Sequence, residues 1–321
     1  MKLGRLYEFL ISCGMQVDPR PKAQLEKILA QNKKDYEALK EPQKKLFDAE
    51  AIKNPYSDSR ILYGEKDHMV KKILVGIDID VGEILLADRL AAGGRKIDLL
   101  LAHHPQGKAL AGLHGVMDIH IDVLTQAGVP INVAESLMLD RIKEVERKIS
   151  AANHMRAVDA ARILDIPFMC MHTPADNHAY RFVERLMADR RPQILEEIVE
   201  ILLEVPEYQK AAENKCGPKI LNGTPRSRTG KILVDMTGGT EGSKEIFSRL
   251  SNVGVGTLIC MHLSEEHFVK VKDQHINVII AGHIASDSLG LNLLLDKLAR
   301  QDKFEFITVS GFERVKHRCP A

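Results

Sequence analysis

Several histidines in this sequence follow apolar runs that are typical of buried strands. The stretch IDLLLAHHPQG (97–107) ends such a run on His103 and His104, and Pro105 stops the strand directly after them. A polar pair at the end of a buried run costs free energy unless it has partners. Similar strand-end positions are occupied by His172, His262 and His283. Because functional groups collect at the carboxyl ends of strands in open parallel sheets, these side chains are candidates for one shared site.

Two aspartates stand at a matched offset from two of these histidines. The segments HTPAD (172–176) and HIASD (283–287) both read His-x-x-x-Asp at a strand-to-helix switch. This spacing places both side chains on one side of the first helical turn, where Asp176 or Asp287 could bridge two ions. Imidazole with carboxylate suits Zn, Fe, Mn or Ni, and the absence of nearby thiols argues against a soft-ligand site. Consecutive strand side chains diverge, so the two adjacent histidines could hold different ions of a pair about 3.5–4 Å apart.

Each of these residues also has a simpler interpretation. A His-His pair at a loop start can be solvated, and His262 alone could be a hydrogen-bonded core histidine. Thr173, Pro174 and Asp176 match an N-cap, a first-turn proline and an N3 acid, and Asp287 has the same ambiguity. The convergence of histidines and carboxylates at equivalent strand ends favours a site. Seven further histidines lack this context and are predicted to be surface residues: His114, His120, His154, His178, His267, His275 and His317.

The elements that must position these residues form an internal repeat. KKILVGIDID predicts a strand, VGEILLADRLAAGG a helix and IDLLLA a second strand, an alternation that indicates parallel pairing in an α/β layer. A second strand–helix–strand unit, GKILVDMTGG, SKEIFSRLSNVG and GTLICMH, begins at Gly230. Ile73–His103 and Ile232–His262 span the same number of residues, which indicates a duplicated unit.

These patterns predict an α/β fold of two related α/β halves. Apolar residues at helical spacing predict N-terminal helices up to about residue 50, and a turn-rich segment follows them at 54–60. The predicted division is an N-terminal helical segment (1–64), a first α/β half (65–190) with a helical insertion at about 113–164, a helix and linker (191–229), and a second α/β half (230–321).

Composition narrows the class of protein. A chain of 321 residues can hold one large or two ordinary domains, and a formal net charge of +1 gives no argument for nucleic acid or an acidic membrane surface. The absence of Trp disfavours stacking platforms for single strands. Five scattered cysteines fit free thiols in a reducing compartment. With neither a signal-peptide pattern nor an apolar run of membrane length, the sequence predicts a cytoplasmic protein.

The site motifs resemble those of the NIF-three-like family, whose members are often labelled GTP cyclohydrolase I type 2 homologues. The family pattern has a strand ending in His-His-Pro, then His-Thr-Asn-Leu-Asp, and near the C-terminus Gly-His-x-x-Ser-Glu. The matching segments are AHHPQG (102–107), HTPAD (172–176) and GHIASD (282–287), in the same order. The resemblance covers roughly residues 65–110 and 165–310. The chain departs from the pattern where Asp287 replaces the family glutamate, where Pro-Ala replaces Asn-Leu, and in a longer gap between the first two motifs.

The resemblance implies a site for two divalent metal ions and a ring-shaped homohexamer with the sites facing an internal cavity. Carried over by position, the implied ligands are His103, His104, Asp176, His283 and Asp287, the last touching both ions. His172 and His262 match family positions near the site, where they would orient ligands or substrate.

The leading functional hypothesis is a metal-dependent hydrolase acting on a nucleotide or another small phosphate-containing or amide substrate, in which His172 or His262 serves as general acid or base. The alternative is a non-catalytic metal-binding ring that engages a partner protein or nucleic acid. The segment MTGGTEGS (236–243) is a candidate phosphate cradle, but we favour a plain strand-to-helix turn.

Overall fold

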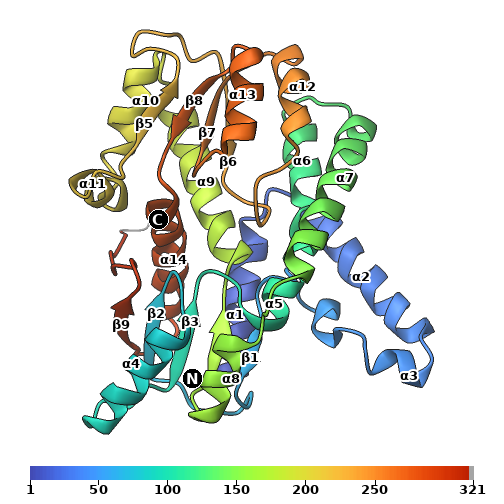
Figure 1. The fold of residues 1–321 in the computed structure, drawn as a ribbon, viewed down its shortest axis with the longest axis vertical. Coiled ribbons are helices and arrows are strands. Elements are labelled where there is room, and N and C mark those ends of the chain that lie inside the picture. The colour runs from blue at the N-terminus through green and yellow to red at the C-terminus, as the bar shows by residue number, and fades with distance from the viewer. Residues whose placement is uncertain (318–321) are drawn as a thin grey trace.

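The computed structural model describes residues 1–317 and shows two β-sheets with helices packed around them (Figure 1). Within this range the first sheet has the strand order β1-β4-β3-β2-β9, and the second has the order β5-β8-β7-β6. The strands are β1 (Ile61–Tyr63), β2 (Lys72–Gly76), β3 (Leu99–Ala102), β4 (Phe168–Cys170), β5 (Lys219–Asn222), β6 (Lys231–Asp235), β7 (Val255–Cys260), β8 (Asn277–Ile280) and β9 (Glu305–Val309).

The two sheets repeat the same topology. The order β1-β4-β3-β2 corresponds strand by strand to β5-β8-β7-β6, and in both sheets the first of these strands is antiparallel while the others are parallel. The helix between the repeated strands is α4 (Val81–Ala92) in the first half. In the second half it is the 3-10 turn η3 (Lys244–Ile246) followed by α12 (Phe247–Asn252). The predicted fold class of two related α/β halves is confirmed.

Three strands were not predicted. β1 and β5 are the antiparallel edge strands, and neither shows a clear alternating pattern over its short length. β9 follows the last helix of the second half, yet it pairs in parallel with β2 and so completes the sheet of the first half. The last strand in the described residues therefore belongs to the first sheet.

Helices form where the sequence places helical spacing, at the N-terminus and in the insertion of the first half. Asp80 is the N-cap of α4, and its carboxylate accepts the N–H of Val81 at 2.8 Å; the helix ends before Gly93 and Gly94. The N-terminal helices are α1 (Leu3–Gln16), α2 (Lys22–Ala38), α3 (Glu41–Lys44) and the 3-10 turn η1 (Ala49–Ile52). The insertion contains the 3-10 turn η2 (Leu113–Val116), α6 (Ile119–Gln126), α7 (Ile131–Ser150) and α8 (Arg156–Ile163). The remaining helices are α5 (Gly107–Ala111), α9 (Thr173–Arg190), α10 (Leu195–Leu202), α11 (Pro206–Glu213), α13 (Glu265–Asp273) and α14 (His283–Ala299).

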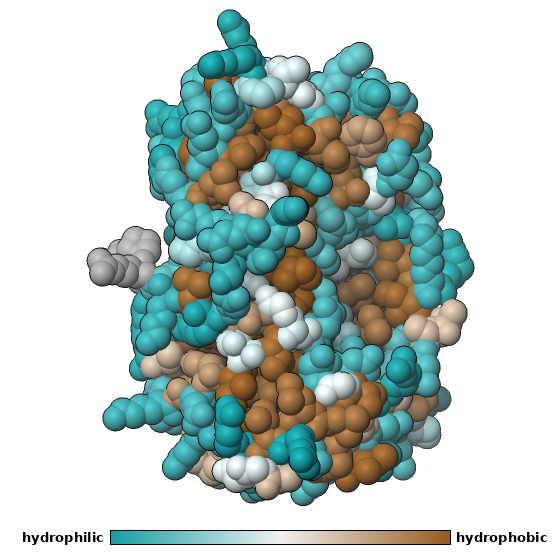
Figure 2. Space-filling model, turned by 60° about the vertical axis from the view of Figure 1, so that its left-hand side comes forward, coloured by the Kyte–Doolittle hydropathy of each residue, from teal (hydrophilic) through white to brown (hydrophobic). Residues whose placement is uncertain are grey.

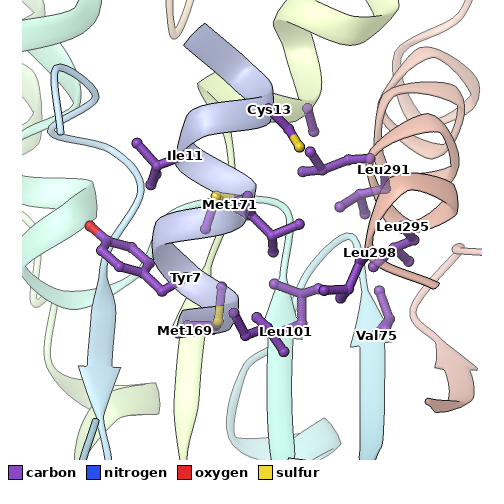
Figure 3. Packing of buried hydrophobic residues seen from close by; sticks show 14 of the residues in the cluster. Tyr7, Ile11, Cys13, Val75, Leu101, Met169, Met171, Leu291, Leu295 and Leu298 are labelled. Atoms are coloured by element: carbon purple, nitrogen blue, oxygen red, sulfur yellow. The ribbon is translucent and has the colours of Figure 1, made fainter. Parts of the chain in front are cut away.

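The main core lies between the first sheet and the helices α1 and α14 (Figure 3). Tyr7 and Ile11 of α1 and Leu295 of α14 converge on Val75 and Leu101 of the sheet, and all five are buried. Each buried aliphatic side chain of this kind contributes roughly 1.5–3 kcal/mol. The core thus fixes α14 against the strands whose ends carry the histidines.

The helices α9 and α14 touch backbone to backbone. A Cβ atom added to Gly290 of α14 would lie 2.3 Å from the carbonyl oxygen of Ala175 in α9, so only glycine allows this approach. The contact holds the first turn of α9, which carries Asp176, against α14, which carries Asp287 about one turn before Gly290.

No helix in residues 1–317 combines the length and apolar character needed to cross a bilayer.

Candidate metal centre

The adjacent histidines are fixed at the end of β3 by the neighbouring strand. The backbone N–H groups of His103 and His104 donate to the carbonyl oxygens of Gly76 and Ile77, each at 2.9 Å. The side chain of His103 is completely buried, whereas that of His104 is 23% exposed. The two rings diverge, with an interplanar angle of 45°, so each faces a different set of neighbours.

The first set of ligand atoms comes from three buried side chains. His103 Nε2 lies 3.3 Å from Asp176 Oδ1 and 3.4 Å from Asp287 Oδ1. One ligand atom from each of the three lies within 4.8 Å of the others, a spacing that one metal ion can span.

The second set shares one of these carboxylates. Asp287 Oδ2 lies 3.4 Å from His104 Nε2 and 3.6 Å from His283 Nε2. The two oxygens of Asp287 therefore face different histidines. Asp287 is shorter than the glutamate of the family pattern. It still reaches both sets because it projects from α14 where that helix lies against α9.

These residues fit a divalent cation better than they fit one another. The separations of 3.3–3.6 Å are long for hydrogen bonds. Two N or O ligands each about 2.0–2.2 Å from one tetrahedral ion lie roughly 3.3–3.6 Å apart.

Several ligand atoms in the centre are also orphaned. Both ring nitrogens of His103, Asp176 Oδ1 and both oxygens of Asp287 are buried without a hydrogen-bond partner in the described residues. An unpaired buried polar group costs about 1–3 kcal/mol, and a cation held by these atoms would remove that cost.

The charges of the centre are strongly coupled. Burial by itself would lower the pKa of His103, but the carboxylates of Asp287 and Asp176 outweigh it and raise this pKa to about 10. Burial would raise the pKa of Asp287, but His103, His104 and His283 hold it well below its usual range. Asp287 is therefore a carboxylate anion, the form that binds metal ions.

His172 lies next to the first set, and a hydrogen bond to Asp58 fixes its ring on the side away from the centre. Its Nδ1 lies 2.8 Å from Asp58 Oδ2, and because a carboxylate can only accept, the imidazole N–H donates. Its Nε2 points to the centre, 3.7 Å from Asp176 Oδ2, and one nitrogen of its ring groups with those of His103 and His104. Burial would raise the pKa of Asp58, but hydrogen bonds from His172 and Thr173 lower it.

His262 lies beside the centre on its open side. Its ring centroid is 4.7 Å from that of His283, and its side chain is 48% exposed. Its Nδ1 is 3.5 Å from Glu241 Oε1, and this carboxylate raises the pKa of His262. His262 does not join any of the His/Asp groups that the structure forms within residues 1–317.

Three carboxylates that partner the site histidines were not found from the sequence. Asp78 lies 2.7 Å from His104 Nδ1, and Glu241 faces His262. Both follow strands, β2 and β6, so the strand-end rule that selected the histidines would also have selected them. Asp58 precedes β1, and because β1 runs antiparallel, its start lies at the carboxyl ends of the other strands.

The structure bears on two of the simpler interpretations. α9 has Pro174 and Asp176 in its first turn, as the helix-start interpretation requires, but no backbone N–H donates to Asp287 or to Asp176 Oδ1 in residues 1–317. His120, His178 and His267 are buried rather than exposed, so for them the prediction of surface positions was wrong.

His120 is buried because the helical insertion packs on the loop 236–243. Its Nε2 lies 2.8 Å from the carbonyl oxygen of Thr240, and a Cβ on Gly238 would lie 2.6 Å from the same nitrogen. Gly238 therefore serves this contact, with a φ of +103° that favours glycine. A cavity of about 90 Å³ beside the metal centre is lined by His120, Leu124, Thr240, Glu241 and His262.

Comparison with known proteins gives structural relatives only. No protein-family model matches the chain, and no curated protein matches it either. Among solved structures, a NIF3 superfamily protein from Sphaerobacter thermophilus is 27% identical, with 80% of this chain and 92% of that chain covered and a TM-score of 0.70. Reduced HcgD from Methanocaldococcus jannaschii is 15% identical, with 83% and 94% covered and a TM-score of 0.52, and shares the fold.

Proposed function

Because this chain belongs to the NIF3 superfamily and its His/Asp groups can hold metal ions, we propose that it binds two divalent ions and hydrolyses a small substrate with them. The observation that carries the proposal is Asp287, whose two oxygens face two different histidine sets at 3.4–3.6 Å. A carboxylate in that position is suited to join two cations. Zn, Fe, Mn and Ni all suit this donor set.

The proposed ligands divide between the two sets. His103 and Asp176 would hold one ion, His104 and His283 would hold the other, and Asp287 would touch both. Bound divalent ions supply Lewis acidity, which activates water at neutral pH and polarises a substrate oxygen. Buried carboxylates without other partners keep these residues available for metal.

We propose that His172 and His262 move protons or orient the substrate. His262 is the more accessible, since its half-exposed ring lies against His283 and its Nδ1 faces Glu241. The Nδ1–H of His172 is fixed on Asp58, which leaves its Nε2 facing Asp176 and the centre. A proton donor or acceptor must be within reach of the reacting group, and both rings border the same cavity.

The proposed substrate class is a nucleotide or another small phosphate-containing or amide compound. The cavity joins the metal centre to an apolar wall that includes Leu124, Phe247 and Leu250. At about 90 Å³ the cavity suits the reacting end of such a substrate, whose remainder would lie outside it. The loop 236–243 borders this cavity, but Gly238 is explained by packing on His120 and Gly239 by packing on Val116.

We also propose a homohexamer in the cytoplasm. Large apolar side chains are exposed on the neighbouring helices α4 and α8, among them Leu85, Leu86 and Ile163. Figure 2 shows a broad apolar area at the lower end of the molecule, where Figure 1 places these helices. Contiguous exposed apolar surface commonly marks a protein–protein interface, which supports self-association.

The test is a hydrolase screen with nucleotides, phosphoesters and amides. The purified protein is compared with the same protein after chelation and after reloading with Zn, Mn, Fe or Ni. Turnover that stops on chelation and returns with metal supports the proposal. His262→Asn should retain its metal and lose turnover. If the protein holds two ions but turns over none of these substrates, the hydrolase proposal is contradicted. The alternative of a non-catalytic metal-binding ring is then favoured.

A further inference from the structure

The two halves differ at one sheet edge. In the first sheet β2 lies between β3 and β9, whereas in the second sheet the corresponding strand β6 pairs only with β7. Figure 1 shows β6 as the outer strand of its sheet, on the side of α6. Within residues 1–317, no backbone group of β6 bonds to any partner outside this sheet. An exposed edge of this kind is a template for another strand.

The first half shows what an occupant of this edge looks like. β2 has the sequence KILVG and β6 the sequence KILVD, so Lys72 corresponds to Lys231. β9 lies parallel to β2 with Glu305 opposite Lys72, and the Glu305 carboxylate lies 3.1 Å from the Lys72 ammonium group. The equivalent lysine of β6, Lys231, has no such acidic partner among the described residues, and its ammonium group donates instead to the carbonyl oxygen of Ala127 at the end of α6, at 2.6 Å.

A groove of about 640 Å³ runs beside β6. Its walls are α6, α9 and the segment that leads into β6, and apolar side chains including Val123, Ala127 and Met187 line it. An extended peptide added to β6 would direct alternate side chains towards this lining and away from it.

The groove carries uncompensated positive charge. Arg191, Arg228 and Lys231 line it, and the acidic partners of the neighbouring arginines, Glu204 and Glu196, pair with Arg190 and Arg226 rather than with any of these three in residues 1–317. The only carboxylate in the lining, Glu184, is already bound by Arg181 at 2.6 Å. The groove therefore complements an acidic segment.

We propose that the β6 edge docks an extended acidic segment of another protein, which adds as a strand parallel to β6 and places a carboxylate opposite Lys231. Main-chain hydrogen bonds to the free edge would supply affinity, and the basic side chains would select acidic sequences. The proposal is independent of the metal centre and of the hydrolase.

A peptide of residues 302–310, DKFEFITVS, is the probe, because it contains the strand that covers the corresponding edge. It is labelled and titrated with the full chain by fluorescence anisotropy, beside a Glu305→Lys peptide and an Ile307→Pro peptide that lacks one strand N–H. We expect the first peptide to bind best. Lys231→Glu should weaken its binding roughly threefold to tenfold and should favour the Glu305→Lys peptide instead.

A matched control is Lys219→Glu, which reverses an exposed lysine on β5, the other edge of the same sheet. This variant should bind as the wild type does. A photo-crosslinker at Phe306 of the peptide should label residues 228–234.

Three results would overturn the proposal. The first is no binding, or equal binding of the three peptides. The second is crosslinking to β2, which would mean exchange with the chain's own β9. The third is an oligomer that Lys231→Glu dissociates, which would mean that a second copy covers β6.

Discussion

The two halves of the molecule place equivalent histidines in different surroundings. His103 and His172 of the first half correspond to His262 and His283 of the second through the internal repeat, and the ring contacts match: 4.8 Å between centroids in the first pair and 4.7 Å in the second. The side chains of the first pair are 0% and 8% exposed, whereas those of the second are 48% and 40% exposed. One half buries its histidines and the other opens them to the cavity.

The difference in exposure follows from the residues that cover the histidines in each half. Asp58 and the segment before β1 enclose His172 in the first half, and α14 covers His103 with Asp287. In the second half the acidic partner of His262 is Glu241, from the glycine-rich loop 236–243, and the His262 ring stays 48% exposed. A duplicated scaffold has thus produced one buried histidine pair and one pair that opens to the cavity, while both halves contribute ligands to the metal centre.

Substituting the equivalent histidines His103 and His262 should give the largest contrast. His103→Ala leaves Asp176 and Asp287 buried without a cationic partner, so the metal-free protein should lose about 3–5 kcal/mol of stability and also bind less metal. His262→Ala removes a half-exposed side chain and should cost less than about 1 kcal/mol, with metal retained. Urea unfolding and elemental analysis measure both. Equal losses in the two variants would break the proposed division between the halves.

Substituting Asp58 and Glu241, the acidic partners of His172 and His262, should give a smaller contrast between the two halves. In Asp58→Asn the amide no longer carries the charge that holds His172 and Thr173, which should cost about 1–3 kcal/mol. Metal affinity should fall roughly tenfold to hundredfold, because partners of this type orient the groups at a metal site. Glu241→Gln, the control in the second half, should leave metal affinity unchanged. A titration with Zn²⁺ in competition with a chelating dye compares the two variants, and identical affinities would contradict the asymmetry.

The edge lysines should give the smallest contrast. Lys72→Glu places like charges opposite each other where Lys72 and Glu305 now pair, at a partly exposed position, and should cost about 0.2–1 kcal/mol. Lys231→Glu has no acid to repel on its edge, but it removes the hydrogen bond from the Lys231 ammonium group to the Ala127 carbonyl oxygen, which should cost about 0.5–1.5 kcal/mol at any salt concentration. Thermal unfolding of both variants at low and high salt is the measurement. A loss at Lys231 that shrinks at high salt, as the loss at Lys72 should, would show that an acid already faces β6.

The repeat made the core of the fold predictable from the sequence. Equal spacing of Ile73–His103 and Ile232–His262 identified two strand–helix–strand units, and the structure has them. The strand-end rule brought His103 and His104 into one site with Asp287, since parallel strands end at one edge.

The remaining elements depend on tertiary contacts that leave no local pattern. β1 and β5 are three and four residues long, and β9 pairs with a strand more than two hundred residues away. Asp58 lies in a turn-rich segment, and only the direction of β1 brings it to the site. The burial of His120 requires the helical insertion to dock on the loop after β6, which no periodicity in either segment predicts.

The central claim, that Asp287 joins two ions, is tested most directly by counting the metal bound to Asp287→Asn. Asparagine keeps the shape and the helix-start chemistry of aspartate but lacks the negative charge that two cations require. The wild type should hold two divalent ions per chain, and so should Asp287→Glu, which restores the family residue. Asp287→Asn should lose at least one ion while circular dichroism shows an unchanged fold. Two ions retained by Asp287→Asn at unchanged affinity would contradict the account.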